Sequence, residues 1–186
     1  MAAALRVMKR EGIAAATTRA ICAEADMPHG AFHYCFRSKQ ELYAALLSTD
    51  INIDLDAAWP AVSPQADPAE NVRTLLRAYW SAVETDPTMQ LVLDELVNLA
   101  LREPELSELP TWGHRAYLDK TVSYLERFTD EARLELTIGT RAFAEMIISA
   151  LSGVISSWLA HRDNDTAVET LDNFAVLFAT LTRPSP

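Results

Sequence analysis

Two histidines have the spacing that most directly suggests chemistry. His29 and His33 are four residues apart, so on a helix they would share one face and could hold a metal ion. Cys35 is near them, but no third ligand stands at the spacing of a known metal motif. We therefore predict that the protein binds no metal and needs no cofactor.

A catalytic arrangement is not visible in the sequence. The chain contains no nucleophile-elbow, phosphate-loop, dinucleotide-binding or zinc-protease motif. Its carboxylate pairs, such as Asp94 with Glu95, are adjacent in the sequence, and adjacent residues of a helix do not face each other. We expect a protein that is not an enzyme.

The composition is typical of a helical protein with a sizeable core. The 186 residues are 49% hydrophobic and include only 5 glycines. Two cysteines are too few for a disulfide framework, which favours a cytoplasmic location, and no signal peptide is visible. Serines and a glycine interrupt the most apolar run, Met146 to Leu159, so we expect no membrane association.

Charge is distributed unevenly along the chain. The net charge is −10, but residues 1–47 carry six basic and four acidic side chains, whereas the remainder carries ten basic and 22 acidic ones. A positive excess confined to one end indicates a segment that faces nucleic acid, although chance variation can produce the same asymmetry.

The N-terminal part of the chain predicts four helices, over residues 2–11, 19–25, 29–36 and 39–59. Gly12 would end the first helix, and Thr17 or Thr18 would cap the second. Pro28 follows a turn and suits the start of the third helix. Two short helices joined by a tight turn, behind a supporting helix, form a helix-turn-helix.

Two further patterns position these helices. Phe32 and Phe36 are four residues apart, so they would be the buried anchors of the third helix. Ser38 and Glu41 have the spacing of a capping box at the start of the fourth helix, which we extend to Trp59. The remainder predicts long helices over about 68–86, 87–101, 111–131, 137–161 and 166–182.

The segment from Thr18 to Leu42 resembles the DNA-binding head of the TetR family of transcriptional regulators. The positions that agree with the family pattern are Thr18, Ile21, Ala25, Gly30, Phe32, Phe36, Ser38, Lys39, Glu41 and Leu42. The match covers roughly residues 5–47, and the rest agrees only in helical layout. The resemblance implies an all-α fold of about nine helices, with a three-helix DNA-binding head at residues 1–47 and a helical bundle for effector binding and dimerisation at residues 48–186.

The sequence departs from the family pattern at several positions. Asp26 replaces the turn glycine, which an aspartate can do because it tolerates the left-handed conformation. His33 stands where the family has tyrosine, with Tyr34 beside it, and Cys35 replaces a histidine. Relatives also carry a few basic residues before the first helix. Either the true start lies upstream of Met1, or phosphate contact is reduced here.

The resemblance implies that the third helix reads operator DNA in the major groove. Gly30 would allow close approach of the backbone, and the Ala31 methyl group could touch a thymine methyl. Residues at the starts of the second and fourth helices would contact phosphates. The predicted DNA-binding residues are Thr18, Arg19, His29, Gly30, Ala31, His33, Tyr34 and Lys39.

The last two helices predict a homodimer. The final helix is apolar nearly all round, so it must be buried on more than one side, and a second copy of the chain is the cover that the resemblance favours. An unusually well-buried monomer core is the alternative. The predicted interface residues are Ile147, Leu151, Val154, Trp158, Leu171, Phe174 and Phe178.

The resemblance also implies a small-molecule effector whose identity the sequence does not specify. Candidate pocket residues, chosen as aromatic and apolar side chains of the body, are Trp80, Met89, Leu93, Trp112, Tyr117, Phe143 and Met146. We thus expect a repressor that an effector releases from its operator. The alternative is a helical small-ligand-binding or interaction protein with a degenerate DNA-binding head.

Overall fold

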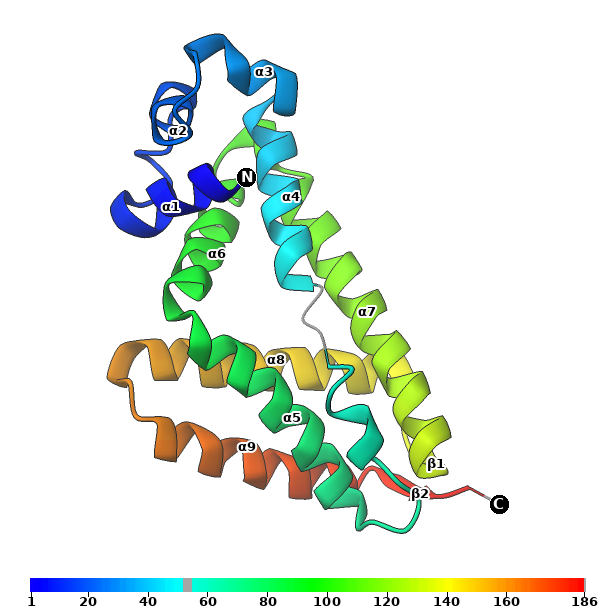
Figure 1. Cartoon of the computed structure of the whole chain (residues 1–186). Coiled ribbons are helices and arrows are strands. Elements are labelled where there is room, and N and C mark those ends of the chain that lie inside the picture. The colour runs from blue at the N-terminus through cyan, green and yellow to red at the C-terminus, as the bar shows by residue number, and fades with distance from the viewer. Residues whose placement is uncertain (52–54, 186) are drawn as a thin grey trace. The chain divides into compact units, whose positions relative to one another are not determined.

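A computed structural model describes residues 1–51 and 55–185 of the chain (Figure 1). In that part of the chain it has nine α-helices, which confirms the predicted all-α class, together with three short 3-10 turns and one pair of short strands. The elements are α1 (Ala2–Glu11), α2 (Thr18–Glu24), η1 (His29–Ala31), α3 (Phe32–Cys35), α4 (Lys39–Ile51), η2 (Trp59–Ala61), α5 (Pro68–Thr85), α6 (Pro87–Ala100), η3 (Pro104–Leu106), α7 (Leu109–Ala132), β1 (Leu134–Leu136), α8 (Thr140–His161), α9 (Asn164–Ala179) and β2 (Thr182–Pro184).

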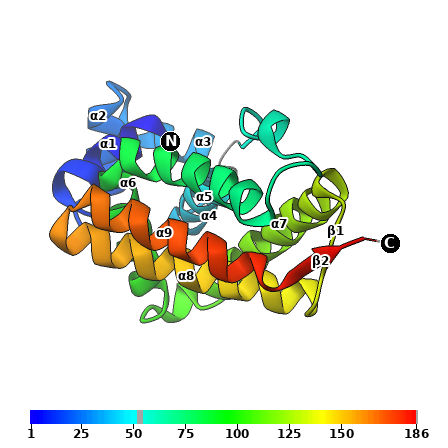
Figure 2. The ribbon, with the colours of Figure 1, turned by 90° about the horizontal axis from the view of Figure 1, so that it is seen from below.

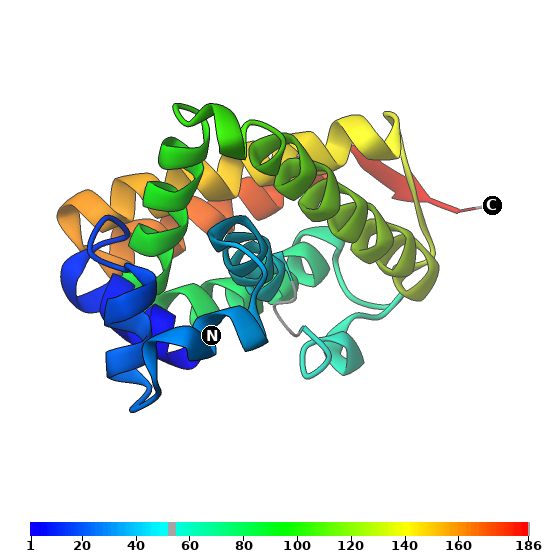
Figure 3. The ribbon, with the colours of Figure 1, turned by 90° about the horizontal axis from the view of Figure 1, so that it is seen from above.

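The described chain forms two compact units. Residues 1–51 and 86–116 form the first unit, and residues 55–85 and 117–185 form the second. The first unit therefore includes α6, η3 and the start of α7, and Figure 3 shows the green chain turning from α6 through η3 into α7. The structural division does not follow the boundary at residue 47, so the functional division into residues 1–47 and 48–186 stays a prediction.

One hydrophobic core holds the first unit together. Val7 and Met8 of α1, Leu42 of α4 and Leu96 of α6 are each at most 1% exposed and belong to the same cluster of apolar side chains. The N-terminal helices thus bury their apolar faces partly against α6, which lies far from them in the sequence.

Two polar contacts attach α1 and its end to α6. Lys9 of α1 forms an ion pair with Asp86, which is also the N-cap residue of α6. The backbone N–H of Ile13 donates a hydrogen bond of 3.1 Å to the carboxylate of Glu95. Gly12 ends α1 with a positive φ of 82°, as predicted for a glycine in that place.

The second unit is built around α5, α8 and α9. Figure 2 shows α8 and α9 side by side, joined by a short turn in which Arg162 is left-handed, with a φ of 57°. Aromatic side chains fill the interior. Phe143 packs edge-to-face on Phe178 with ring centroids 5.5 Å apart, and Trp80 packs on Trp158 at 5.1 Å.

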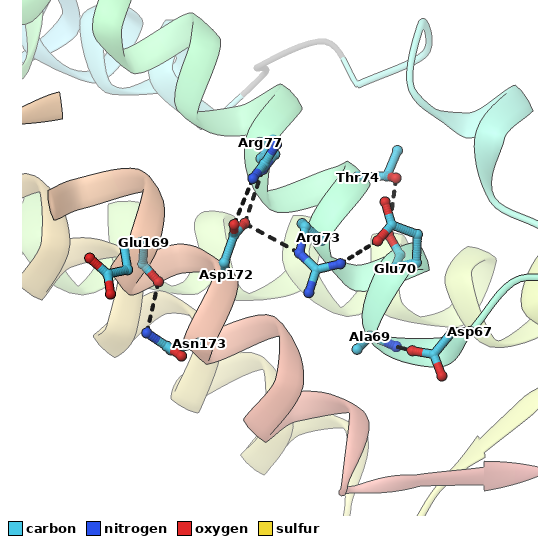
Figure 4. A network of polar contacts seen from close by, with 9 residues as sticks. All are labelled: Asp67, Ala69, Glu70, Arg73, Thr74, Arg77, Glu169, Asp172 and Asn173. Carbon is cyan, nitrogen blue, oxygen red and sulfur yellow. Dashed lines mark hydrogen bonds and ion pairs between the residues drawn. The ribbon is translucent and has the colours of Figure 1, made fainter. Parts of the chain in front are cut away.

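Two arginines of α5 clamp α9 (Figure 4). Arg77 donates hydrogen bonds of 2.9 and 2.6 Å to the two carboxylate oxygens of Asp172, and Arg73 lies 3.3 Å from the same carboxylate. The hydrogen bonds from Arg77 hold the pKa of Asp172 below its ordinary value. Because the three side chains are partly exposed, water screens their charges, and the clamp contributes more to the relative position of α5 and α9 than to stability.

Helix α8 is the one helix of the described residues that is long and apolar enough, by length and composition only, to cross a membrane. One such helix is weak evidence of a membrane span, and the expected absence of membrane association stays a prediction. Leu151, Val154 and Trp158 of α8 are buried in the core of the second unit, and a core helix meets the same criterion.

The structure corrects two predicted helix boundaries. The fourth helix ends at Ile51 and does not reach Trp59, which lies in the separate turn η2 with Pro60 next to it. The predicted helix over 137–161 begins only at Thr140, because residues 134–136 form a strand.

That strand pairs with the end of the described chain. Strand β1 runs antiparallel to β2, with Glu135 opposite Arg183, and the two side chains form a salt bridge of 2.9 Å. The last helix consequently ends at Ala179, before the predicted 182. Three-residue strands have too little alternation of apolar and polar residues to be recognised in a sequence.

Candidate nucleic-acid interface

The turn between α2 and α3 has the geometry of a helix-turn-helix. Thr17 is the N-cap of α2, and its hydroxyl accepts a hydrogen bond of 3.1 Å from the N–H of Ala20. Asp26 adopts the left-handed conformation with a φ of 53°, which confirms that aspartate can serve where a glycine is expected. The chain then turns into η1 and α3.

The segment His29–Cys35 is the recognition segment of this unit, a 3-10 turn followed by one turn of α-helix. Phe32 is its buried anchor, at 4% exposed, and its ring lies 5.7 Å from the ring of the partly buried Phe36. The thiol of Cys22 donates to the carbonyl oxygen of His29 at 3.3 Å and so fastens the start of the segment to α2.

Most of the predicted DNA-binding side chains are accessible. Arg19, His29, Gly30 and His33 are exposed, Thr18 and Lys39 are partly exposed, and Tyr34 is 93% exposed. A side chain as large as tyrosine that is almost entirely in solvent is unusual in a folded protein, and it stands on the outer face of the recognition segment. The structure therefore leaves these side chains accessible, and their contacts with DNA stay a prediction.

Ala31 is the exception. It is only 6% exposed and belongs to the core of the first unit, which does not favour the predicted contact with a thymine methyl. Ala31 ends the 3-10 turn and Phe32 begins α3, and both are buried. Gly30 lies next to open space, since a Cβ atom there would meet no atom within 4 Å.

The predicted capping box is present in altered form. Ser38 accepts a hydrogen bond of 3.2 Å from the N–H of Glu41, as expected. The Glu41 carboxylate, however, accepts from the N–H of Arg37 at 2.7 Å. This contact holds the backbone of Arg37, whose side chain is exposed. Arg37 was not among the predicted DNA-binding residues, although its charge beside the start of a helix was a usable signal.

The basic side chains of the N-terminal helices fall into two groups. Arg6, Arg10 and Lys9 form ion pairs with carboxylates. Within the described residues, no carboxylate pairs with the other three basic side chains, Arg19, Arg37 and Lys39. All three lie at the starts of α2 and α4 or beside them, where predicted phosphate contacts are concentrated.

The predicted metal pair is not completed by a third ligand. In the part of the chain that the structure describes, no group of three or more histidine, cysteine or acidic side chains could hold a metal ion.

The predicted pocket residues are divided between the two units. Met89, Leu93 and Trp112 belong to the first unit, and Trp80, Tyr117, Phe143 and Met146 belong to the second. Within the second unit, the hydroxyl of Tyr117 donates to that of Tyr79 at 2.8 Å, whereas the buried indole N–H of Trp80 has no hydrogen-bond partner. Met146 and Trp112 are about 40% exposed, and the pocket stays a prediction.

Most of the predicted dimer residues are buried inside a single chain. Leu151, Val154, Trp158, Leu171 and Phe178 are at most 6% exposed. They have little exposed surface within a single chain, while Ile147 and Phe174 are partly exposed, and the predicted interface stays a prediction. Helical periodicity identifies an apolar stripe but does not tell which part of it faces the chain's own core.

A different set of α8 and α9 side chains is accessible. Met146 is 40% exposed, Val176 51% and Leu177 52%. Two open hollows of about 280 and 450 Å³ lie beside them and share Ser149, Ala150 and Phe174 in their walls. The two helices thus keep an apolar, hollowed face that no other described part of the chain covers.

Comparisons with known proteins agree with this geometry. Residues 1–46 match the model of the bacterial regulatory proteins, tetR family. The chain is 27% identical over 175 residues to HdnoR, a nicotine-responsive transcriptional repressor of Paenarthrobacter nicotinovorans. The aligned region covers 92% of this chain and 87% of that protein.

Solved structures extend the likeness to the whole fold. The multidrug binding protein EbrR in complex with ethidium is 28% identical, with a TM-score of 0.65 over 92% of this chain and 93% of that one. A transcriptional regulator from Rhodococcus superposes with a TM-score of 0.72 at 19% identity, over 100% of this chain and 96% of that one.

The left-handed turn residue can be tested directly. We expect Asp26→Gly to leave the stability unchanged or to raise it, and Asp26→Ala to lower it by about 1–2 kcal/mol, because alanine is strained at a positive φ. Urea denaturation of both variants measures the difference. Equal stability of the glycine and alanine variants would contradict the proposed strain at this turn.

Proposed function

We propose that the chain, whose N-terminal helices match the TetR family of transcriptional regulators, is a homodimeric repressor that a small-molecule effector releases from operator DNA. The observation that carries this proposal is the exposed recognition segment His29–Cys35 on a helix-turn-helix that the family model covers. Likeness to a repressor over most of the chain supports the sign of the regulation. We expect the protein to act in the cytoplasm.

The attachment of α6 to the N-terminal helices supports release by an effector. Helix α5 ends at Thr85 and α6 begins at Pro87, so the single residue between them is Asp86, which also pairs with Lys9 of α1. Glu95 of α6 makes a second contact, because its carboxylate accepts a hydrogen bond from the N–H of Ile13 after α1. A displacement of α5 by a ligand would therefore be passed through one residue to the DNA-binding helices.

The recognition segment is tested by its most exposed side chain. We expect Tyr34→Ala to weaken binding to the promoter region next to the protein's own gene by about tenfold, the size of one lost base or phosphate contact. Gel-shift titrations at fixed salt measure the affinity. Gln65→Ala, an exposed site in the second unit, is the matched control and should bind as the wild type does. Equal binding by Tyr34→Ala would remove this residue from the interface.

The second copy is proposed to pack on the exposed face of α8 and α9. A charge placed there would be buried without a partner, so Leu177→Glu should convert the dimer to a monomer at micromolar concentration. Sedimentation velocity reports the mass of each species. Gln65→Glu adds the same charge outside this face and should remain dimeric. A dimeric Leu177→Glu variant would place the interface elsewhere.

We infer that the effector is an aromatic amine or organic cation. HdnoR is nicotine-responsive and EbrR is complexed with ethidium, and both relatives cover most of the chain. Aromatic faces and carboxylates attract cations. In this chain the aromatic core of the second unit lies in the acidic part of the sequence, which supports the same ligand class.

Ethidium and nicotine are suitable probes. We expect ethidium to quench the fluorescence of the tryptophans in DNA-free protein, and nicotine, which does not intercalate, to release the promoter fragment in a gel shift. Stearoyl-CoA, an anionic ligand, is the control and should do neither. Release by stearoyl-CoA but not by nicotine would overturn the proposed ligand class.

A further inference from the structure

One glutamate of the first unit holds two arginines. Glu24, the last residue of α2, accepts a hydrogen bond of 2.7 Å from Nε of Arg6 and one of 3.0 Å from Nη1 of Arg10. A second nitrogen of Arg6 donates to the carbonyl oxygen of Glu24 at 3.2 Å. Both carboxylate oxygens are therefore occupied, and the two guanidinium groups are drawn from α1 toward the end of α2.

The electrostatics of this cluster favour its ionised form. The hydrogen bonds from Arg6, and then from Arg10, hold the pKa of Glu24 below its ordinary value. Glu11 adds a second negative charge to the cluster, because its carboxylate lies 2.8 Å from the guanidinium group of Arg10. Two arginines and two glutamates thus cancel at this corner of the unit.

The cluster stands close to the proposed DNA-binding surface and remains accessible. The Arg6 and Arg10 side chains are each 55% exposed, and Glu24 is two residues before the turn residue Asp26 that leads into the recognition segment. DNA of arbitrary sequence binds through phosphates alone, so any free guanidinium near this surface would contribute to it. A guanidinium that already has a carboxylate partner contributes less, because the phosphate must first displace that partner.

We propose that Glu24 lowers the affinity of the protein for DNA of arbitrary sequence by withholding Arg6 and Arg10 from phosphates, which increases its preference for the operator. The phosphate contacts that remain come from the unpaired Arg19, Arg37 and Lys39. They stand beside the recognition segment and are engaged in register only when that segment is docked. The inference rests on the proposed DNA binding.

The salt dependence of binding tests this role, because it counts the phosphates that are neutralised. Four forms of the full-length protein are titrated with a duplex of scrambled sequence and with the promoter fragment, over a series of salt concentrations. They are the wild type, Glu24→Gln, the double variant Arg6→Gln with Arg10→Gln, and the triple variant that combines all three changes. Glu105→Gln removes one exposed negative charge from the same unit and is the control for net charge.

We expect Glu24→Gln to make the slope of log K against log salt on scrambled DNA steeper by about one to two, which is one released contact for each arginine. Its preference for the promoter fragment over scrambled DNA should fall. The double and triple variants should both keep the wild-type slope, because in them no arginine is available to be released. A structural clamp between α1 and α2 would change the melting temperature of Glu24→Gln without this pattern of slopes.

Three results would overturn the proposal. They are an unchanged slope in Glu24→Gln, a steep slope that persists in the triple variant, and a slope that drops in the double variant, which would show that the arginines already contact phosphate. If circular dichroism shows that Glu24→Gln does not fold, the slope of the double variant still tests the proposal. A wild-type protein without salt-dependent DNA binding would instead contradict the proposed function, so the two failures are distinguishable.

Discussion

The attachment of α6 to the first helix is the constraint on which the rest of the structure depends. Asp86 caps α6, pairs with Lys9 and is the whole connection between α5 and α6. Without a surface on α6 to cover them, Val7 and Met8 would lose part of their burial, since they share one core with Leu96. A three-helix head is too small to bury enough apolar surface by itself, so it shares a core with a helix from the middle of the chain.

The sequence predicted well what depends on neighbouring residues. Three features follow from local rules, and the structure confirms each of them. They are the end of α1 at Gly12, the left-handed conformation of Asp26 and the burial of Phe32. Features that depend on distant residues were not predictable. Ala31 is buried at the end of a 3-10 turn that the sequence did not indicate. The last helix ends early because β2 follows it, and β2 pairs with a strand some 48 residues away, as the contact of Arg183 with Glu135 shows.

The same limit explains the candidate dimer surface. An apolar helix stripe predicts burial but not the identity of the cover, so the residues with the strongest hydrophobic signal, such as Leu171, are those that the chain buries itself. The sequence likewise gives the number of basic and acidic residues in the N-terminal helices but not which of them form ion pairs. Because Lys9, Arg6 and Arg10 are paired, the proposed DNA binding would depend on few free charges, and the proposed dimer would strengthen it by engaging two copies at once.

The discontinuous second unit has a consequence for the order in which the protein is made. The first unit is complete once the ribosome has synthesised residue 116, whereas the second begins at residue 55 and closes only when β2 pairs with β1 at the end of the described chain. Trp80, for example, packs on Trp158, which is synthesised almost 80 residues later. During translation the DNA-binding helices can therefore be folded while the body is still open, and this interval is when exposed apolar surface of α5 needs protection from aggregation.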